Sequence, residues 1–359
     1  MCKQQNLDSI YKSGGGKNRE CNIELLRLVS MIMVMIVHAN SLANNMPTIS
    51  ELDNLPPTIM RTMVQTFANV NVDVFVLISG WFGLKFSVRG VVNILFQCIF
   101  YTFLSVCLVL WGWSESFSVT ALLKSLYFGS CYWFVVAYLG LMVLSPILNM
   151  FVEHASRKTL KYFLVIYFVY ECIYGWVSLD EAHFINGYSF VSFIGLYLLA
   201  RYVKLYKPRI CCFGKYKSLG IYIACSFLSG MAIFVMLLIG NETMASIVKD
   251  KMLAYNSPLC MCAALFLLLS FSRINLGTNK VINWLASSCF AIYLLHCNSL
   301  ILPRYLDLMH NMYLKYDGIW CVCMIFYVIL FLAFIIILVD KPRLFIYKSL
   351  CKNKKYYSL

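Results

Sequence analysis

The sequence predicts an all-α, polytopic membrane protein with about ten transmembrane helices and both termini in the cytoplasm. Three observations predict this fold. Of the 359 residues, 61% are hydrophobic and only 13% are charged, whereas a soluble domain carries about 25% charged residues. The apolar residues gather in long runs, and about 20 such residues can cross a bilayer as a helix. The basic residues between these runs favour one side of the membrane.

Ten apolar runs, separated by charged or Pro/Gly-rich breaks, are the candidate spans. They cover residues 23–43, 70–85, 90–111, 131–151, 160–179, 188–203, 219–240, 252–271, 284–302 and 318–339. The chain is therefore expected to divide into a polar cytoplasmic tail (1–22), a transmembrane domain (23–340) and a basic cytoplasmic tail (341–359). The first run is too long for the apolar part of a cleaved signal peptide, and no small-residue cleavage pattern follows it.

The distribution of basic residues supports this arrangement. With the N-terminus inside, most of the 30 Lys and Arg residues fall in the inner gaps and the two tails, as the positive-inside rule predicts. The outer loops hold only Arg61, Lys124, Lys249, Lys251, Arg304 and Lys315. Topology thus accounts for the net charge of +14, so we expect membrane lipids around the protein and no nucleic-acid partner.

The 16 cysteines do not predict a metal or disulfide framework. No CxxC pair occurs, and most cysteines lie inside apolar runs, where Cys usually acts as a small apolar residue. No HExxH motif, Walker loop or dinucleotide fingerprint is present, so we predict no metal. His154, His183 and His310 lie in predicted loops and receive no role.

Ionisable residues inside predicted spans are the candidate functional groups, because a bilayer makes them costly. They are Glu24, Arg27, His38, Asp73, Glu171 and His296. His38 follows Arg27 by eleven residues, which brings the two within about 20° of the same helix face, roughly 16 Å apart along the axis. Glu24, three residues before Arg27, is placed to pair with it. The first span therefore carries a polar stripe.

Structural interpretations of these residues remain open. Glu24 and Arg27 also fit an interfacial anchor and its partner, and His38 fits a hydrogen-bonded core histidine. Asp73 fits a carboxylate at a helix N-terminus. Glu171, in the middle of the fifth predicted span, either pairs with a buried cation such as Arg27 or has a function.

Three aromatic residues and one glycine complete the candidate features. Trp133 and Tyr138 open the fourth predicted span, where a tryptophan is typical of the aromatic belt at the membrane surface. Tyr293 precedes His296 by three residues and shares its helix face. Gly80, within an apolar run after Ser79, would allow close approach of another helix.

The chemistry of the stripe points to group transfer. A histidine within the membrane is a competent general base or transient acyl acceptor near neutral pH. An arginine at the cytoplasmic mouth suits a phosphate-bearing ligand, and basic inner loops would concentrate an anionic donor. These residues do not identify the donor.

Four segments resemble the acyltransferase 3 family of integral membrane acyltransferases. The first is Arg27 followed by His38, within residues 22–38. The others are Asp73-Val74-Phe75 with Ser79-Gly80; Trp133-Phe134 with Tyr138 and Pro146; and Tyr293-Leu294-Leu295-His296. A closing Asp340-Lys341-Pro342 also fits, so the resemblance covers about residues 19–343.

The resemblance implies an O-acyltransferase that moves an acyl group, usually acetyl from acetyl-CoA, onto a hydroxyl of a cell-surface or exported glycan. His38 would be the catalytic residue, and Arg27 would help to hold the donor or position the site. Beyond the resemblance, we expect Glu24 to assist Arg27 in donor binding, and Glu171 and Asp73 to help with charge balance. Trp133, Tyr138, Tyr293 and His296 would border the acceptor, a glycan or lipid-linked sugar. The expected location is the cytoplasmic membrane.

Two other classes compete with this interpretation. A transporter or flippase for a glycan or polar solute would also need many helices and buried charges, although its inverted repeats are not evident here. A membrane assembly partner without chemistry of its own is the third class. The oligomeric state has no signal in the sequence.

Overall fold

A computed structural model describes residues 20–112, 132–178 and 183–352. These residues form helices and connecting turns without a strand, as predicted. The helices are α2 (Cys21–Val37), α3 (Leu55–Ala68), α4 (Asn71–Phe82), α5 (Val88–Gly112), α8 (Trp133–His154), α9 (Arg157–Tyr170), α10 (Phe190–Tyr206), α11 (Lys215–Ile239), α12 (Glu242–Leu253), α13 (Pro258–Ser272), α14 (Lys280–Ala286), α15 (Cys289–His296), α16 (Leu302–Lys315) and α17 (Gly318–Lys352). Two π-helical turns, η2 (His38–Leu42) and η4 (Glu171–Val177), continue α2 and α9.

Within these ranges, eight helices are long and apolar enough to cross a membrane, which makes the chain a multi-pass membrane protein. They are Cys21–Leu42, Leu55–Phe82, Val88–Gly112, Trp133–His154, Arg157–Val177, Lys215–Ile239, Glu242–Ser272 and Gly318–Ile346. The second and seventh of them are longer than the predicted spans, because α3 continues into α4 and α12 into α13.

Of the ten predicted spans, the sixth corresponds to a short helix and the ninth to a broken one. The sixth corresponds to α10, whose 17 residues extend only about 25 Å. The ninth is broken into α14 and α15, with a turn at Ser287–Ser288 between them and further turns after Cys297. The total of ten spans and the cytoplasmic location of both termini therefore stay predictions.

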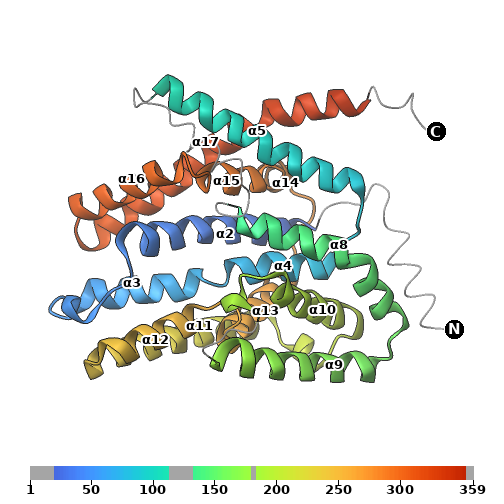
Figure 1. The fold of residues 1–359 in the computed structure, drawn as a ribbon, viewed down its shortest axis with the longest axis horizontal. Coiled ribbons are helices and arrows are strands. Elements are labelled where there is room, and N and C mark those ends of the chain that lie inside the picture. Colours follow the sequence, from blue (N-terminus) through green and yellow to red (C-terminus); the bar gives the residue numbers. More distant parts are fainter. Residues whose placement is uncertain (1–19, 113–131, 179–182, 353–359) are drawn as a thin grey trace.

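Helix α2 lies in the middle of the bundle. In Figure 1 it passes between α14, α15 and α17 on one side and α3 and α4 on the other, and it contacts all of these helices. It contributes Ile23 and Leu26 to a core cluster shared with α4, α10 and α13. It contributes Met31 and Met35 to a second cluster shared with α5, α15 and α17. Both halves of the bundle therefore pack on the helix that carries the polar stripe.

The outer helices present apolar side chains away from these cores. Phe103 on α5, Ile166 on α9 and Phe331 on α17 are each more than half exposed. A soluble protein rarely exposes large contiguous apolar surfaces, whereas lipid chains cover them at no cost in hydration. The surface composition therefore agrees with a membrane environment.

Gly80 lies where α4 and α10 approach each other closely, as its sequence context predicted. A Cβ atom built at Gly80 would lie 2.5 Å from the Tyr197 carbonyl oxygen and 2.8 Å from the Ala200 Cβ. Neither atom belongs to a flexible side-chain end, so the helices would have to separate. The contact between α4 and α10 thus depends on glycine.

We expect Gly80→Ala to lower the free energy of unfolding by about 1–3 kcal/mol, because overpacking forces the backbones apart. The midpoint of thermal unfolding in detergent measures this. Gly220→Ala is the matched control: Gly220 lies inside α11 with nothing within 4 Å of its Cβ position. Equal midpoints for the two variants would show that the close contact has no energetic weight.

Candidate functional site

The polar stripe of α2 faces a cavity of about 740 Å³. Arg27 and His38 both line it, together with residues of α4, α8 and α15. Glu24 lies behind Arg27, and both of its carboxylate oxygens accept hydrogen bonds from the arginine Nη1 at 2.9 Å. Arg27 keeps 31% of its side chain exposed. One face of one helix therefore supplies both a cation and a histidine to the cavity.

His38 lies at the junction where α2 becomes the π-helical turn η2. π-Helical turns inside α-helices are frequent at functional sites. Here the π-helical turn begins at His38 itself, and Ser41, also in η2, lines the same cavity. The change of helical geometry thus occurs at the polar residue itself.

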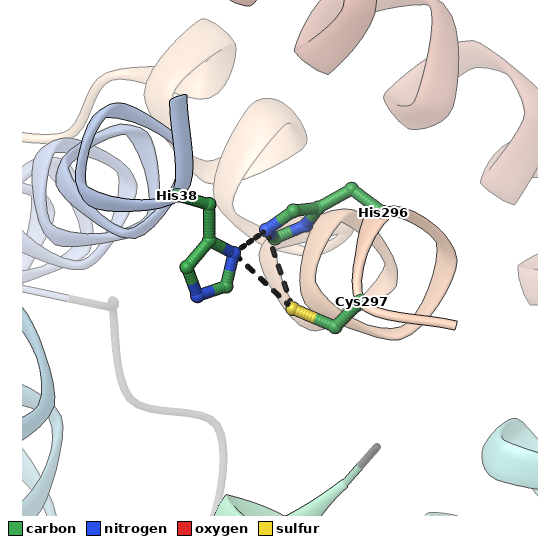
Figure 2. Close-up of side chains that lie close together, drawn as sticks. All are labelled: His38, His296 and Cys297. Carbon is green, nitrogen blue, oxygen red and sulfur yellow. Dashed lines mark hydrogen bonds between the residues drawn. The ribbon is translucent and has the colours of Figure 1, made fainter. Parts of the chain in front are cut away.

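His38 contacts His296, the last residue of α15. The His38 Nδ1 lies 3.2 Å from the His296 Nε2 (Figure 2). His296 Nδ1 lies 2.6 Å from the Ile292 carbonyl oxygen, which can only accept, so Nδ1 carries the proton. The neutral His296 Nε2 is then an acceptor, and it accepts from His38 Nδ1. The lone pair of His38 is thereby left on Nε2, which points away from His296 (Figure 2).

Cys297 completes the cluster, and the sequence analysis missed it. Its Sγ lies 3.3 Å from the His296 Nε2 and 3.8 Å from the His38 Nδ1 (Figure 2). Cys297 lines the cavity and is 4% exposed. Its position directly after a buried histidine was the available signal, but the cysteines had been interpreted together as apolar residues.

Hydrogen bonds from neighbouring helices fix α15 against α2. Tyr132 donates from its hydroxyl to the Leu294 carbonyl at 2.7 Å and accepts from the Asn298 amide at 2.8 Å. Tyr305 on α16 donates to the Met35 carbonyl of α2 at 2.8 Å. The bonded residues lie close in sequence to the two histidines: Leu294 and Asn298 on either side of His296, and Met35 three residues before His38. These bonds hold the two helices that carry the histidine pair in register.

The predicted aromatic residues lie on the cavity wall. Trp133, Tyr138 and Tyr293 all line the cavity. The Tyr138 hydroxyl lies 3.2 Å from the Ser79 Oγ, whereas the Tyr293 hydroxyl has no hydrogen-bond partner in the described part of the chain. Trp133 packs against two rings that the sequence analysis did not select, Tyr188 at 4.5 Å and Tyr255 at 6.0 Å between centroids.

Asp73 and Glu171 are not brought to His38. Neither lines the cavity, and their side chains are completely enclosed, with 1% and 0% exposure. Asp73 lies in the first turn of α4 but is not its N-cap. Arg27 pairs with Glu24, so Glu171 does not have the partner suggested for it. A helping role for either carboxyl stays a prediction without a supporting contact.

The described residues include one group that could ligate a metal. The donor atoms of His38, His296 and Cys297 lie within 4.8 Å of one another, which is close enough for one transition-metal ion. The absence of a metal, expected from the sequence motifs, stays a prediction.

Comparison with known proteins identifies the family. The model of the acyltransferase 3 family, described as an acyltransferase domain, matches residues 22–339. No curated protein and no solved structure matches the chain. The matched range includes α2, the cavity and the histidine pair, and extends over nearly the whole chain. This protein therefore belongs to the acyltransferase 3 family of membrane acyltransferases.

Proposed function

We propose that this protein transfers acetyl from acetyl-CoA to a hydroxyl of a cell-surface or exported glycan, in the cytoplasmic membrane. The observation that carries the proposal is the single cavity in which Arg27 and the free Nε2 of His38 are both presented. Family membership supports acyl transfer; acetyl-CoA as the donor and a glycan as the acceptor are what the family resemblance implies, and the residues of the cavity suit both.

Arg27 is suited to the anionic end of the donor. Its guanidinium is always charged and matches the geometry of phosphate oxygens. The Glu24 carboxylate holds it through Nη1 alone, so the other nitrogens are available to a ligand. The basic inner segments predicted from the sequence would steer the donor to this end of the cavity.

His38 is suited to act on the acceptor. With Nδ1 donating to His296, its Nε2 can remove the proton from a sugar hydroxyl, or it can attack the acyl carbonyl and carry the acyl group. Both routes need the same tautomer. The orientation of His38 by His296 follows the pattern of a base held by a second polar group.

The acceptor side of the cavity is aromatic and hydroxyl-bearing. Tyr293, Tyr138 and Trp133 offer flat apolar faces together with polar groups at their edges, which suits a sugar ring with its alternating apolar and hydroxyl surfaces. Tyr293 lines this wall, and its hydroxyl is buried there without a hydrogen-bond partner among the described residues. We assign this wall to the glycan or lipid-linked sugar.

We expect His38→Ala to lower acetyl transfer by about 10²–10⁴-fold, because the base or acyl carrier is removed. Transfer of labelled acetyl from acetyl-CoA to glycan, in membranes with matched protein levels, measures this. His154→Ala is the control, since His154 is exposed and its hydrogen bond is to the Met150 carbonyl of its own helix. Equal label from both variants would assign the polar stripe a structural role. No label from the wild type with native glycans present would favour a transporter.

We expect Arg27→Lys to raise the KM for acetyl-CoA about tenfold with little change in kcat. A lysine keeps the charge but loses a bidentate bond of about 1.5 kcal/mol. Steady-state kinetics with varied donor measure the two constants. Arg157→Lys, on the exposed start of α9, is the control. A fall in kcat alone would place Arg27 in the chemical step instead of in donor binding.

A further inference from the structure

We infer that Cys297 carries the acyl group as a thioester between donor and acceptor, with His296 as its base. This inference rests on the proposed function and deepens it, because it divides the reaction between two groups. His38 then acts only in the second step, as the base for the acceptor hydroxyl and as the acid for the Cys297 sulfur. The geometry that points to this division is the cluster of Cys297, His296 and His38 on one cavity wall.

Cys297 and His296 form a nucleophile–base pair. The distance of 3.3 Å between Sγ and Nε2 is within reach of an S–H···N hydrogen bond. The Ile292 carbonyl fixes the His296 ring from the other side at 2.6 Å, so Nε2 is the nitrogen that can take the thiol proton, in exchange for the hydrogen bond that it accepts from the His38 Nδ1. A nucleophile, a base and a group that orients the base are the three parts that covalent catalysis by cysteine needs.

Access to the cavity separates the roles of the three residues. Cys297 and His38 line the cavity, whereas His296 does not and is 2% exposed. The residue that cannot reach a substrate is therefore the one placed to move a proton to or from its neighbours. The residue with the more nucleophilic atom, the cysteine, faces the substrate.

A second cysteine, the first residue of α15, shows that this arrangement is specific. Cys289 also lines the cavity, but its thiol contacts the Arg27 carbonyl oxygen at 3.4 Å. A carbonyl oxygen can hold a thiol proton but cannot take it at neutral pH. Of these two cavity cysteines, Cys297 is the one that has a base.

The first step is a thioester exchange. The Cys297 sulfur attacks the acyl carbonyl of acetyl-CoA and passes its proton to the His296 Nε2. A bond forms between the Cys297 sulfur and the acyl carbon, and the bond between that carbon and the CoA sulfur breaks. The CoA thiolate leaves with the proton from His296. One thioester replaces another, so no oxidant, reductant or further reactant is required.

The second step transfers the acyl group to oxygen. The His38 Nε2 takes the proton of the acceptor hydroxyl, whose oxygen attacks the thioester carbonyl. The carbon–oxygen bond forms, the carbon–sulfur bond breaks, and the His38 Nδ1 returns a proton to the Cys297 sulfur, 3.8 Å away. The ring proton is then on Nε2, and exchange with water returns it to Nδ1, which restores the hydrogen bond to His296 before the next cycle. The sum is acyl transfer from CoA to the hydroxyl.

Two steps also suit one cavity. A direct transfer would need the donor arm and the sugar to occupy the roughly 740 Å³ together. With an acyl-cysteine, CoA leaves before the acceptor enters, and the acyl group alone stays on the wall. Donor and acceptor can then approach from different sides of the membrane.

The test is to trap the acyl-enzyme in purified protein. Wild type and variants in detergent receive labelled acetyl-CoA without acceptor, and acid-quenched samples are digested and the peptides identified by mass spectrometry. We expect label on the peptide that contains Cys297, removed by neutral hydroxylamine, with one CoA released per chain. Cys297→Ala should lose this label and lower glycan acetylation at least about 100-fold, whereas Cys225→Ala, on α11 away from the cavity, should keep both.

His38→Ala separates the two steps. We expect it to accumulate label on Cys297 while glycan acetylation is lost, since only the second step uses His38. Label on residue 38 in the wild type, absent from Cys297, would overturn the inference, as would full glycan acetylation by Cys297→Ala. One equivalent of bound zinc, lost in Cys297→Ala, would overturn it too and make the cluster a metal site.

Failure of the proposed function gives a different result. Wild-type protein that neither takes label nor acetylates glycan from acetyl-CoA would remove the donor from the proposal. Wild-type protein that acetylates glycan without any labelled intermediate would remove only the role of Cys297.

Discussion

The hydrogen bond between His38 and His296 is the constraint on which the site depends. It joins residues 258 positions apart and requires α2 and α15 to meet at one point inside a membrane domain. In an apolar medium an unpaired imidazole costs free energy, so the pair stabilises this helix contact and sets the tautomer of both rings. The bonds of Tyr132 and Tyr305 hold the same contact from neighbouring helices. The contact between α2 and α15 and the tautomers needed for catalysis therefore both depend on His38 and His296.

Much of this arrangement could be predicted because a helix has a fixed period. The positions of Glu24, Arg27 and His38 on one face follow from the helical repeat, and the structure places Arg27 and His38 in one cavity with Glu24 paired to Arg27. The lengths of the apolar runs likewise predicted most of the membrane-spanning helices. The sequence context of Gly80 predicted its close contact with another helix. Periodicity works wherever the signal lies within a single helix.

Contacts between helices could not be predicted by the same reasoning. Hydropathy shows that His296 is costly in its span but not that its partner is His38, because nothing in one helix specifies its neighbour. Cys297 was overlooked since a cysteine in an apolar run has the same pattern whether it packs or reacts. The break between α14 and α15 was missed because broken and continuous helices share one composition. Asp73 and Glu171 were predicted to have a function only because burying a carboxyl group is costly, and no contact in the described part of the chain supports that function.

The rigidity of α2 has a consequence for the choice of donor. Arg27 and His38 lie on one α-helix that packs with both halves of the bundle, so their separation along its axis, roughly 16 Å, is set by the helical rise. Movement of the surrounding helices leaves that separation unchanged. Under the proposed function, a donor whose phosphate binds Arg27 would have to present its reactive carbonyl at the cluster of His38 and Cys297, which only an arm of matching length could do. The helix would then select acyl donors by length, whatever acyl group they carry.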